Sequence, residues 1–237
     1  MWIGLKIKLN SKISIVIPAL DEEKGIGKTI SSIPKDELLK LGYDTEIVVI
    51  DNGSKDGTGK IARELGAKVV YESKRGYGSA YKTGFSNVSG DIIVTCDADG
   101  TYPVEDIPRL VWLLQSKELD FLNTNRFEYL DKESMPLRNV IGNYILTCTM
   151  RVLFGIKTND SQSGMWIFKR SILDKLQLDY TDWVFSQELK IEACFYAKCK
   201  WGEEPIKYYK RLGKVKSNGW IVGSRDLYYL FKKRWVR

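Results

Sequence analysis

Histidine is absent from all 237 residues of the chain. This absence excludes a Ser-His-Asp triad, a Cys-His pair, an H-E-x-x-H zinc site and an imidazole base. Acid–base chemistry and metal binding therefore fall to carboxylates, amides, lysine, arginine, tyrosine and the backbone.

Cysteine and long apolar runs are scarce. The four cysteines form no C-x-x-C pair, which favours reduced core thiols in a cytosolic protein over disulfides or a zinc site. No stretch reaches 18 consecutive apolar residues, so we expect no transmembrane helix. The first 12 residues mix lysine with short apolar runs, so we expect no signal peptide and a cytoplasmic protein.

The remaining composition is that of an ordinary globular protein, with 43% hydrophobic and 28% charged residues. The length fits one α/β domain with a short C-terminal extension. A net charge of +7 suits phosphate ligands, nucleic acid or an anionic membrane surface as partners. Because the basic residues are interleaved with acidic ones, we expect no nucleic-acid binding.

Short β-branched runs alternate with helical stretches along the first half of the chain. Strands are expected at residues 13–17, 46–50, 68–71, 91–95 and 120–124. Helices are expected at residues 25–41 (broken near Pro34), 57–65, 78–87 and 105–116. This alternation is typical of βαβ units and predicts a parallel sheet.

The second half is less regular. Helices are expected at residues 137–154, 186–198 and 224–234, and strands at residues 165–168 and 205–208. No linker or internal repeat divides the chain, so we expect a single domain.

Two glycine motifs begin like phosphate loops without completing them. Residues 27–29 (Gly-Lys-Thr) end like a Walker A loop, but Glu22 stands where that loop needs its first glycine. Residues 76–78 (Gly-Tyr-Gly) open like a dinucleotide fingerprint, but Tyr81 occupies the third glycine position. These departures exclude ATPase and NAD-dependent dehydrogenase activities.

Acidic side chains follow the expected strands at the points where those strands end. Glu22 follows the first strand, Asp51 ends the second, and Asp97 and Asp99 follow the fourth. Because the carboxyl ends of parallel strands meet at one edge of a sheet, these acids should converge there. Two carboxylates separated by one small residue suit Mg²⁺ or Mn²⁺. The alternative for Asp97-Ala98-Asp99 is a solvated turn.

The segment of residues 51–58 reads as a turn followed by the start of a helix. Asp56 or Thr58 can cap that helix, since both residue types are favoured there. Asp51 can at the same time contact a nucleobase or a ribose.

Three segments taken in order resemble a known family: residues 15–23 (IVIPALDEE), residues 49–58 (VIDNGSKDGT) and Asp97-Ala98-Asp99. They resemble the family-2 inverting glycosyltransferases, and more closely the dolichyl-phosphate mannose or glucose synthase branch. The resemblance covers about residues 12–216. It implies an α/β, GT-A-type fold with a mostly parallel central sheet and helices on both faces.

The resemblance also implies an internal organisation and a set of site residues. The nucleotide-binding half would span about residues 12–125 and the acceptor-side half about residues 126–216, followed by a basic aromatic extension at 217–237. Asp97 and Asp99 would hold Mg²⁺ or Mn²⁺. The nucleotide would be bound by Pro18, Leu20, Glu22, Asp51, Asn52, Gly53, Gly76, Asp97, Ala98, Asp99, Arg211 and Lys216.

On the acceptor side, Arg126 and Arg138 match basic positions that the synthases use for the acceptor phosphate. The segment of residues 160–164 (Asp-Ser-Gln-Ser-Gly) matches the family's D-x-x-S-G element near the sugar. Several positions depart from the family pattern; among them, Asn52 and Ser186 stand where the family has aspartate.

We therefore expect metal-dependent, inverting transfer of mannose or glucose from a GDP- or UDP-sugar to dolichyl or polyprenyl phosphate. A lipid phosphate is already an anion, so the reaction needs no general base; Asp99, Arg126 and Arg138 would act on the reacting phosphates. One alternative is transfer to a saccharide hydroxyl, with Glu188 as base. Another is a non-catalytic protein that binds nucleotide sugars.

Two segments indicate a membrane surface as a partner. Residues 224–237 combine aromatic with basic residues, and residues 140–156 are rich in Ile, Leu, Val and Phe. A basic aromatic helix can lie in an anionic lipid interface. The expected location is therefore the cytoplasmic face of a membrane, peripherally attached. The alternative for residues 224–237 is a helix packed on the domain with a basic tail.

Overall fold

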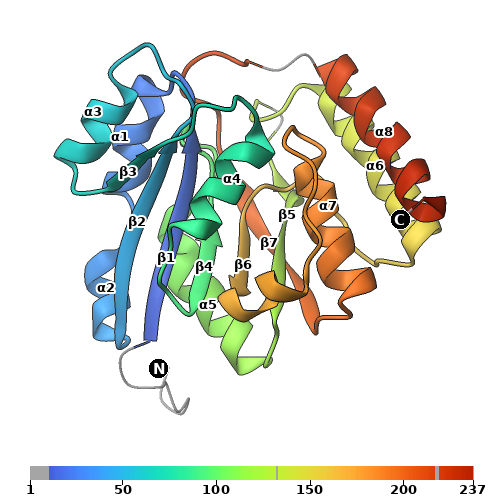
Figure 1. Ribbon diagram of the computed structural model, residues 1–237, viewed down its shortest axis with the longest axis horizontal. Helices are drawn as coiled ribbons and strands as arrows, with labels where there is room; N and C mark the ends of the chain where they lie inside the picture. Colours follow the sequence, from blue (N-terminus) through green and yellow to red (C-terminus); the bar gives the residue numbers. More distant parts are fainter. Residues whose placement is uncertain (1–10, 132, 217–218, 237) are drawn as a thin grey trace.

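The computed structural model describes residues 11–131, 133–216 and 219–236. One seven-stranded sheet runs through the molecule in the order β3-β2-β1-β4-β6-β5-β7 (Figure 1). Its strands are β1 (Ser11–Ala19), β2 (Tyr43–Asp51), β3 (Lys68–Tyr71), β4 (Ile92–Thr95), β5 (Phe121–Leu130), β6 (Trp166–Lys169) and β7 (Trp201–Tyr208).

The sheet is parallel except for β6, which runs antiparallel to both β4 and β5. β1 pairs with β2 from Ser11 opposite Tyr43 to Ala19 opposite Asp51, so these two strands end level with each other. β4 pairs with β1 on its other side. The carboxyl ends of β2, β1 and β4 therefore lie side by side, as the strand pattern predicted.

Helices cover both faces of the sheet because its central strands are apolar on both faces. Ile13, Ile15 and Ile17 face one core, which α1, α2, α3 and α5 cover. Val16 faces the other core, which contains side chains of α4 and α7. The helices are α1 (Glu23–Ser31), α2 (Lys35–Lys40), α3 (Thr58–Glu64), α4 (Tyr77–Ser86), α5 (Ile107–Ser116), α6 (Leu137–Phe154), α7 (Phe185–Ile191) and α8 (Gly219–Trp235).

Helices α6 and α8 form a layer at the side of the molecule, next to α7 (Figure 1). Two contacts show that they run in the same direction. Gly219 lies near Asn139 where both helices begin, and Arg234 Nε donates to the Leu153 carbonyl where both helices end. Leu146 and Met150 of α6 pack with Tyr229 and Leu230 of α8 in a third apolar core.

Most expected elements are present within a few residues of their expected bounds, and β3 and α6 have the expected bounds. Two helices differ. The expected helix at 186–198 is α7 followed by a π-helical turn, η3 (Glu192–Tyr196), and α8 begins five residues before position 224. Gly219, Ile221 and Gly223 have low helix propensity, which concealed that first turn. The remaining short helices are η1 (Val104–Asp106) and η2 (Arg170–Lys175).

Candidate active site

The acidic residues expected at the carboxyl edge of the sheet do lie there. Ala19 pairs with Asp51, and Val16 pairs with Thr95, two residues before Asp97. Pro18 and Leu20 are half-buried at the end of β1. The loops after β1, β2 and β4 therefore form one surface, although they are distant in sequence.

The loops after β1 and β2 are tied together by reciprocal hydrogen bonds. The Glu22 backbone N–H donates to Thr58 Oγ1 at 2.8 Å, and the Lys55 N–H donates to Asp21 Oδ1 at 2.6 Å. In the same direction as the Lys55 bond, the Gly57 N–H donates to Glu23 Oε2 at 3.2 Å. These bonds satisfy backbone groups at the starts of α1 and α3, so the acidic and hydroxyl residues of both loops fix their shape.

The Asp97-Ala98-Asp99 segment is held by its neighbours on both sides. The Thr101 N–H and Oγ1 donate to Asp99 Oδ1 at 3.1 and 2.6 Å, and the Leu212 N–H donates to the Asp99 carbonyl at 2.9 Å. The Tyr77 hydroxyl lies 3.5 Å from Asp97 Oδ1. Burial, and then the neighbouring Asp99 carboxylate, raise the pKa of Asp97.

Two cations from the segment after β7 lie against these acids. Arg211 contacts Glu22 through Nη2 and Asp99 through Nη1, the latter at 3.4 Å, and Lys216 Nζ lies 2.5 Å from Glu22 Oε1. Burial raises the pKa of Glu22, although Lys216 and Arg211 oppose that shift. A cluster of this kind can rearrange around a bound diphosphate, because its cations would then have stronger anions to contact.

The carboxylate pair fits a hard divalent cation that other ligands help to hold. In the described part of the chain, no three Asp, Glu, Cys or His side chains form a ready-made cation site. Asp97 and Asp99 offer oxygen ligands, and the Oε2 atom of the adjacent Glu22 is buried without a hydrogen-bond partner. Mg²⁺ typically takes one or two carboxylates and completes its shell with water and substrate phosphates. The residues present suit that arrangement.

Gly25 of α1 allows the helix to approach this segment closely. A Cβ at Gly25 would lie 2.6 Å from the Ala98 carbonyl oxygen and 2.7 Å from Asp99 Cα. We therefore expect a Gly25→Ala variant to lower the free energy of unfolding by about 1–3 kcal/mol. It should also weaken nucleotide binding, because the Asp99 backbone must move.

Gly27→Ala is the matched control on the same helix. A Cβ at Gly27 meets nothing closer than Ile61 at 3.5 Å, so alanine should stabilise the helix by about 0.5–1 kcal/mol. Denaturant unfolding of both variants measures the difference. Equal stabilities would contradict the close packing of α1 on residues 98 and 99.

The other residues expected to bind the nucleotide are of two kinds: some are accessible to a ligand, and others are buried and hold the backbone of the loop. Asp51 is half-buried and its Oδ1 accepts the Ser54 N–H at 2.8 Å. Asn52 is buried, with its amide nitrogen bonded to the carbonyls of residues 72 and 74 and its oxygen accepting the Gly76 N–H. Both ends of the Asn52 amide thus bind backbone, which explains an amide where the family has a carboxylate. Gly53, with φ +87°, continues this turn.

Gly76 brings the start of α4 against the segment before α7. Its φ is +146°, and a Cβ there would lie 2.1 Å from the Thr181 carbonyl oxygen. Next to it, the Tyr77 ring stacks on Trp183 with ring centroids 4.5 Å apart. The sequence did not predict that the stacked rings of Tyr77 and Trp183 lie beside Asp97, because nothing in their spacing along the chain indicates a contact.

Arg126 is almost fully buried and binds Asp160 through two hydrogen bonds from one edge of its guanidinium. Its Nε and Nη2 donate to the two Asp160 carboxylate oxygens at 2.6 and 2.8 Å, and its guanidinium lies 5.2 Å from the centre of the Tyr208 ring. Although burial alone would raise it, the Arg126 guanidinium holds the pKa of Asp160 below its usual range. The residue expected to bind an acceptor phosphate therefore has a buried carboxylate as its main partner.

Arg138 and Glu188 lie in contrasting places. Arg138 is exposed in the first turn of α6. Glu188 is buried, and its carboxylate accepts the N–H groups of Asp179 and Tyr180 at 3.0 and 2.9 Å. Glu188 thus holds the segment before α7, and its expected role as a general base has no support in this geometry.

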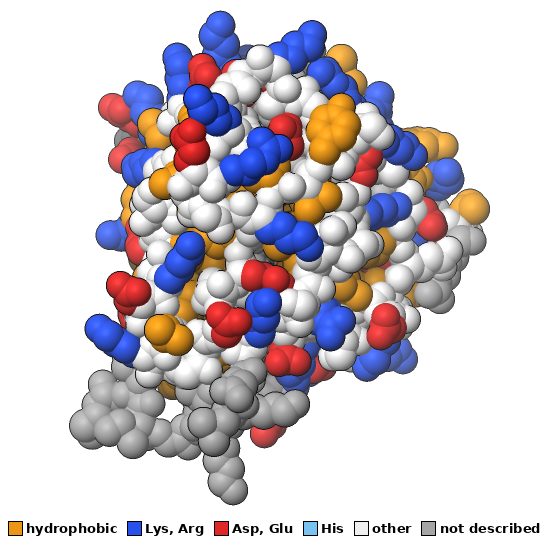
Figure 2. Space-filling model, turned by 60° about the vertical axis from the view of Figure 1, so that its left-hand side comes forward, with side chains coloured by type: hydrophobic (Ala, Val, Ile, Leu, Met, Phe, Trp, Pro, Cys, Tyr) orange, Lys and Arg blue, Asp and Glu red, His pale blue; other side chains and the backbone are white. Residues whose placement is uncertain are grey.

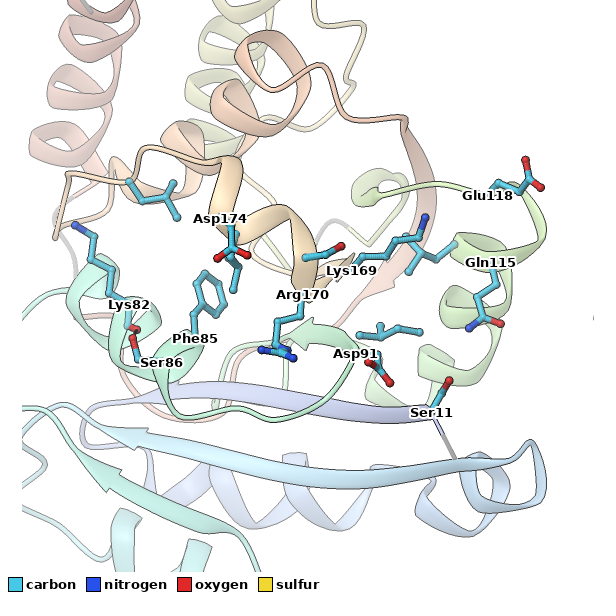
Figure 3. A pocket seen from close by; sticks show the side chains of 15 residues that line it. Ser11, Lys82, Phe85, Ser86, Asp91, Gln115, Glu118, Lys169, Arg170 and Asp174 are labelled. Atoms are coloured by element: carbon cyan, nitrogen blue, oxygen red, sulfur yellow. Dashed lines mark hydrogen bonds between the residues drawn. The ribbon is translucent and has the colours of Figure 1, made fainter. Parts of the chain in front are cut away.

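A separate hollow of about 1050 Å³ lies at the opposite edge of the sheet, near the amino ends of β1 and β4 (Figure 3). Lys82, Lys169 and Arg170 line it together with Asp91 and Asp174. Lys169 is paired with Asp120 at 2.8 Å, and Arg170 Nε donates to the Gly90 carbonyl. The charges of this hollow are mixed, and it is remote from the acidic cluster.

Comparison with known protein sequences gives a family and named relatives. The profile of glycosyl transferase family 2 matches residues 14–177. The chain is 34% identical over 221 residues to the low-salt glycan biosynthesis hexosyltransferase Agl6 of Haloferax volcanii, covering 92% of this chain. It spans about half of that relative, 52% of its length. It is also 28% identical over 215 residues to the dolichyl-phosphate hexose transferase of the same organism, covering 90% of this chain and 89% of that protein.

Solved structures share the fold. The glucosyl-3-phosphoglycerate synthase from Mycobacterium tuberculosis, in complex with Mn²⁺, UDP and glucosyl-3-phosphoglycerate, superposes with a TM-score of 0.74 at 23% identity. The superposition covers 94% of this chain and 80% of that one. At this level of identity the likeness concerns the architecture alone.

Proposed function

The chain belongs to glycosyltransferase family 2, and on that basis we propose that it transfers a hexose from a nucleoside diphosphate sugar to a polyprenyl phosphate. The observation that carries this proposal is the cluster of Asp97, Asp99, Glu22, Arg211 and Lys216 at the carboxyl edge of the sheet. The similarity to a dolichyl-phosphate hexose transferase supports the lipid phosphate as acceptor.

On the donor side, the chain's residues would bind the nucleotide and stabilise the leaving group. Asp51 contacts the base or ribose, while Arg211 and Lys216 turn from Glu22 and Asp99 to the diphosphate. Asp97 and Asp99 would hold Mg²⁺ or Mn²⁺, which supplies positive charge to the departing diphosphate when bound. Arg211 and Lys216 add to that charge where negative charge grows in the transition state.

On the acceptor side, a phosphate monoester oxygen is the nucleophile and needs no general base. The exposed Arg138 is free of packing constraints and can contact the acceptor phosphate by charge-assisted hydrogen bonds. Arg126 is buried on β5, so its positive charge would attract the acceptor phosphate without direct contact. In-line attack would invert the anomeric centre.

Arg138 gives the acceptor a specific test. We expect an Arg138→Gln variant to raise the KM for dolichyl phosphate about tenfold and to leave the KM for the nucleotide sugar unchanged, because one charge-assisted contact is lost. Arg170→Gln, at the opposite edge of the sheet, is the control. An unchanged KM for dolichyl phosphate in Arg138→Gln would refute the acceptor assignment.

A soluble phosphorylated acceptor is the second candidate, favoured by 38% identity over 128 residues, half of this chain, to the glucosyl-3-phosphoglycerate synthase of Petrotoga mobilis. Competition between dolichyl phosphate and 3-phosphoglycerate for the same labelled donor separates the two. The lipid-phosphate proposal predicts label in the lipid phase and no labelled phosphoglycerate.

The outer faces of α6 and α8 fit a membrane surface. Among described residues, the exposed apolar side chains of these helices are Leu137, Ile141, Tyr144, Ile145 and Val152 on α6, and Trp220, Ile221, Tyr228, Phe231 and Trp235 on α8. On α6 they recur at helical spacing, which makes one stripe. None of the helices in the described ranges has the length and apolar content needed to cross a bilayer.

The charges of the same two helices favour an anionic bilayer as the occupant. α6 contains no acidic residue, and the one in α8, Asp226, is buried. The exposed cations are Arg138, Arg151, Arg225, Lys232 and Arg234. The face drawn in Figure 2 is different, because on it Lys and Arg are mixed with Asp and Glu.

We expect Ile145→Glu and Phe231→Glu variants to bind phosphatidylserine-containing vesicles at least about tenfold more weakly than the parent. Each substitution removes an apolar side chain whose burial in the interface stabilises binding by about 1.5–3 kcal/mol. It also adds a negative charge, which the anionic lipid repels. Vesicle co-sedimentation measures the effect. Leu39→Glu is the control, since Leu39 is exposed on α2, away from these helices. Equal binding of all variants, or no binding by the parent, would contradict the proposed surface.

A further inference from the structure

Lys190 of α7 is a buried ammonium without a carboxylate partner. It is 1% exposed, although lysine is rarely buried unless it is paired. In the described ranges, no ion pair within 4.0 Å involves it, and Asp160, the acid whose charge acts on it most strongly, is engaged by Arg126. Burying an ammonium in this way is unfavourable, so the group calls for a functional explanation.

The Lys190 ammonium binds two backbone carbonyls, those of Ser163 and Ser186 (the latter at 3.3 Å), and one hydroxyl. Its Nζ donates to the Ser163 carbonyl at 2.7 Å and lies 3.0 Å from Ser186 Oγ. The Trp166 Nε1–H donates to the same Ser163 carbonyl at 2.7 Å, and Lys190 Nζ lies 5.0 Å from the centre of the Trp166 ring. Ser186, where the family has aspartate, therefore leaves the ammonium with neutral partners only.

The segment that this carbonyl belongs to packs directly on the acidic cluster. Gly164 follows Ser163, and its N–H donates to the Tyr102 hydroxyl at 2.6 Å while its carbonyl accepts Thr95 Oγ1 at 2.8 Å. A Cβ at Gly164 would lie 3.6 Å from Asp97 Oδ1 and 2.6 Å from the Tyr77 hydroxyl. A shift of the Ser163 peptide would therefore move the backbone that touches Asp97.

We propose that Lys190 is a positioning residue for the transfer reaction: its ammonium holds the Ser163 carbonyl and so fixes residues 160–164 against Asp97. This inference rests on the proposed function. The charged and titratable groups that face Lys190 from the elements around it are Asp160, Arg126, Cys194, Glu203 and Asp226.

The charge state of Lys190 gives a readout of its own. Burial, which the Asp160 charge only partly offsets, lowers the pKa of Lys190 to about 7. The unfolded chain keeps its lysines protonated up to about pH 10. Between about pH 7 and 10 the unfolded state therefore binds the additional proton, and the parent's stability should rise with pH in that window.

The test compares Lys190→Met with the parent. Methionine has a similar length and no charge, so the variant should unfold at the same temperature as the parent or a higher one at pH 6. Its kcat should nevertheless fall about tenfold, because a misplaced segment beside the reacting groups is costly to the rate. The melting temperature of the parent relative to Lys190→Met should rise as the pH is raised from 7 to 9.

Ser186→Asp and Ser186→Ala form a matched pair. Aspartate beside the ammonium should shift the alkaline limb of the kcat–pH profile upward by about one pH unit or more, whereas alanine, which removes a hydroxyl acceptor of the ammonium, should shift it slightly downward. A Lys190→Met variant that loses stability but keeps the parent's kcat would overturn the proposal. A parent without any transfer activity would instead refute the proposed function, while the pH-dependent melting comparison would still report on Lys190.

Discussion

An Asp97→Asn variant is expected to keep the parent's fold and to lose hexosyl transfer by a factor of about 10³. Asparagine has the same shape, and the only hydrogen bond of the Asp97 side chain in the described residues is a long one, 3.5 Å from the Tyr77 hydroxyl. The substitution removes one of the two carboxylates proposed to hold the cation and the diphosphate. Loss of one such electrostatic group typically lowers kcat by about 10²–10³.

Two measurements accompany this prediction. Mn²⁺-dependent binding of UDP or GDP should weaken in Asp97→Asn, and thermal unfolding should be nearly unchanged. The control is Asp91→Asn, since Asp91 is exposed and directly precedes the amino end of β4, whereas Asp97 follows its carboxyl end. If Asp97→Asn retained full transfer activity, Asp97-Ala98-Asp99 would be the solvated turn that the sequence left open.

The buried pair of Arg126 and Asp160 gives the largest expected effect on stability. An Arg126→Met variant should lower the free energy of unfolding by about 3–5 kcal/mol, because it leaves the fully buried Asp160 carboxylate without its cation. Denaturant unfolding at pH 7 measures this loss. At lower pH the loss should diminish, since protonation of Asp160 removes the uncompensated charge in the variant.

Arg138→Met is the control for Arg126→Met, because it makes the same substitution at an exposed arginine. It should leave the free energy of unfolding within about 0.5 kcal/mol of the parent. Two arginines that the sequence assigned to one task would thus separate into a structural residue and an acceptor contact. Similar stabilities for both variants would contradict the dependence of Asp160 on Arg126.

The fold was largely predictable because its signals are local. Short β-branched strands alternating with helices predicted the parallel part of the sheet, and the likeness to solved glycosyltransferase structures confirms the GT-A-type α/β fold. The match to the family profile likewise confirms the family resemblance. The antiparallel direction of β6 depends on a long connection through α6, so no short-range pattern indicated it.

The site was predictable where chain direction alone decides position. Asp51 and Asp97 had to meet at the carboxyl edge once their strands were parallel. Partners that depend on tertiary packing were not predictable. The sequence contains Arg126 and Asp160, yet nothing in their spacing shows that they pair.

Burial also changed the expected roles of polar residues. Asn52 and Glu188 have the chemistry of ligand-binding or catalytic groups, but both are buried and bind backbone N–H or carbonyl groups. Lys190 gave no sequence signal, because a lysine in a helix is ordinarily on its solvent face. Which face of α7 is buried is set by the surrounding sheet and helices rather than by α7 itself.

The central claim is tested most directly by a transfer assay with the purified chain, dolichyl phosphate, and labelled GDP- and UDP-hexoses in the presence of Mn²⁺ or Mg²⁺. We predict that label from one donor enters the lipid phase, that chelation of the metal abolishes the transfer, and that Asp97→Asn shows almost none. Donor binding without lipid labelling, under conditions in which the chain binds the vesicles, would contradict the claim.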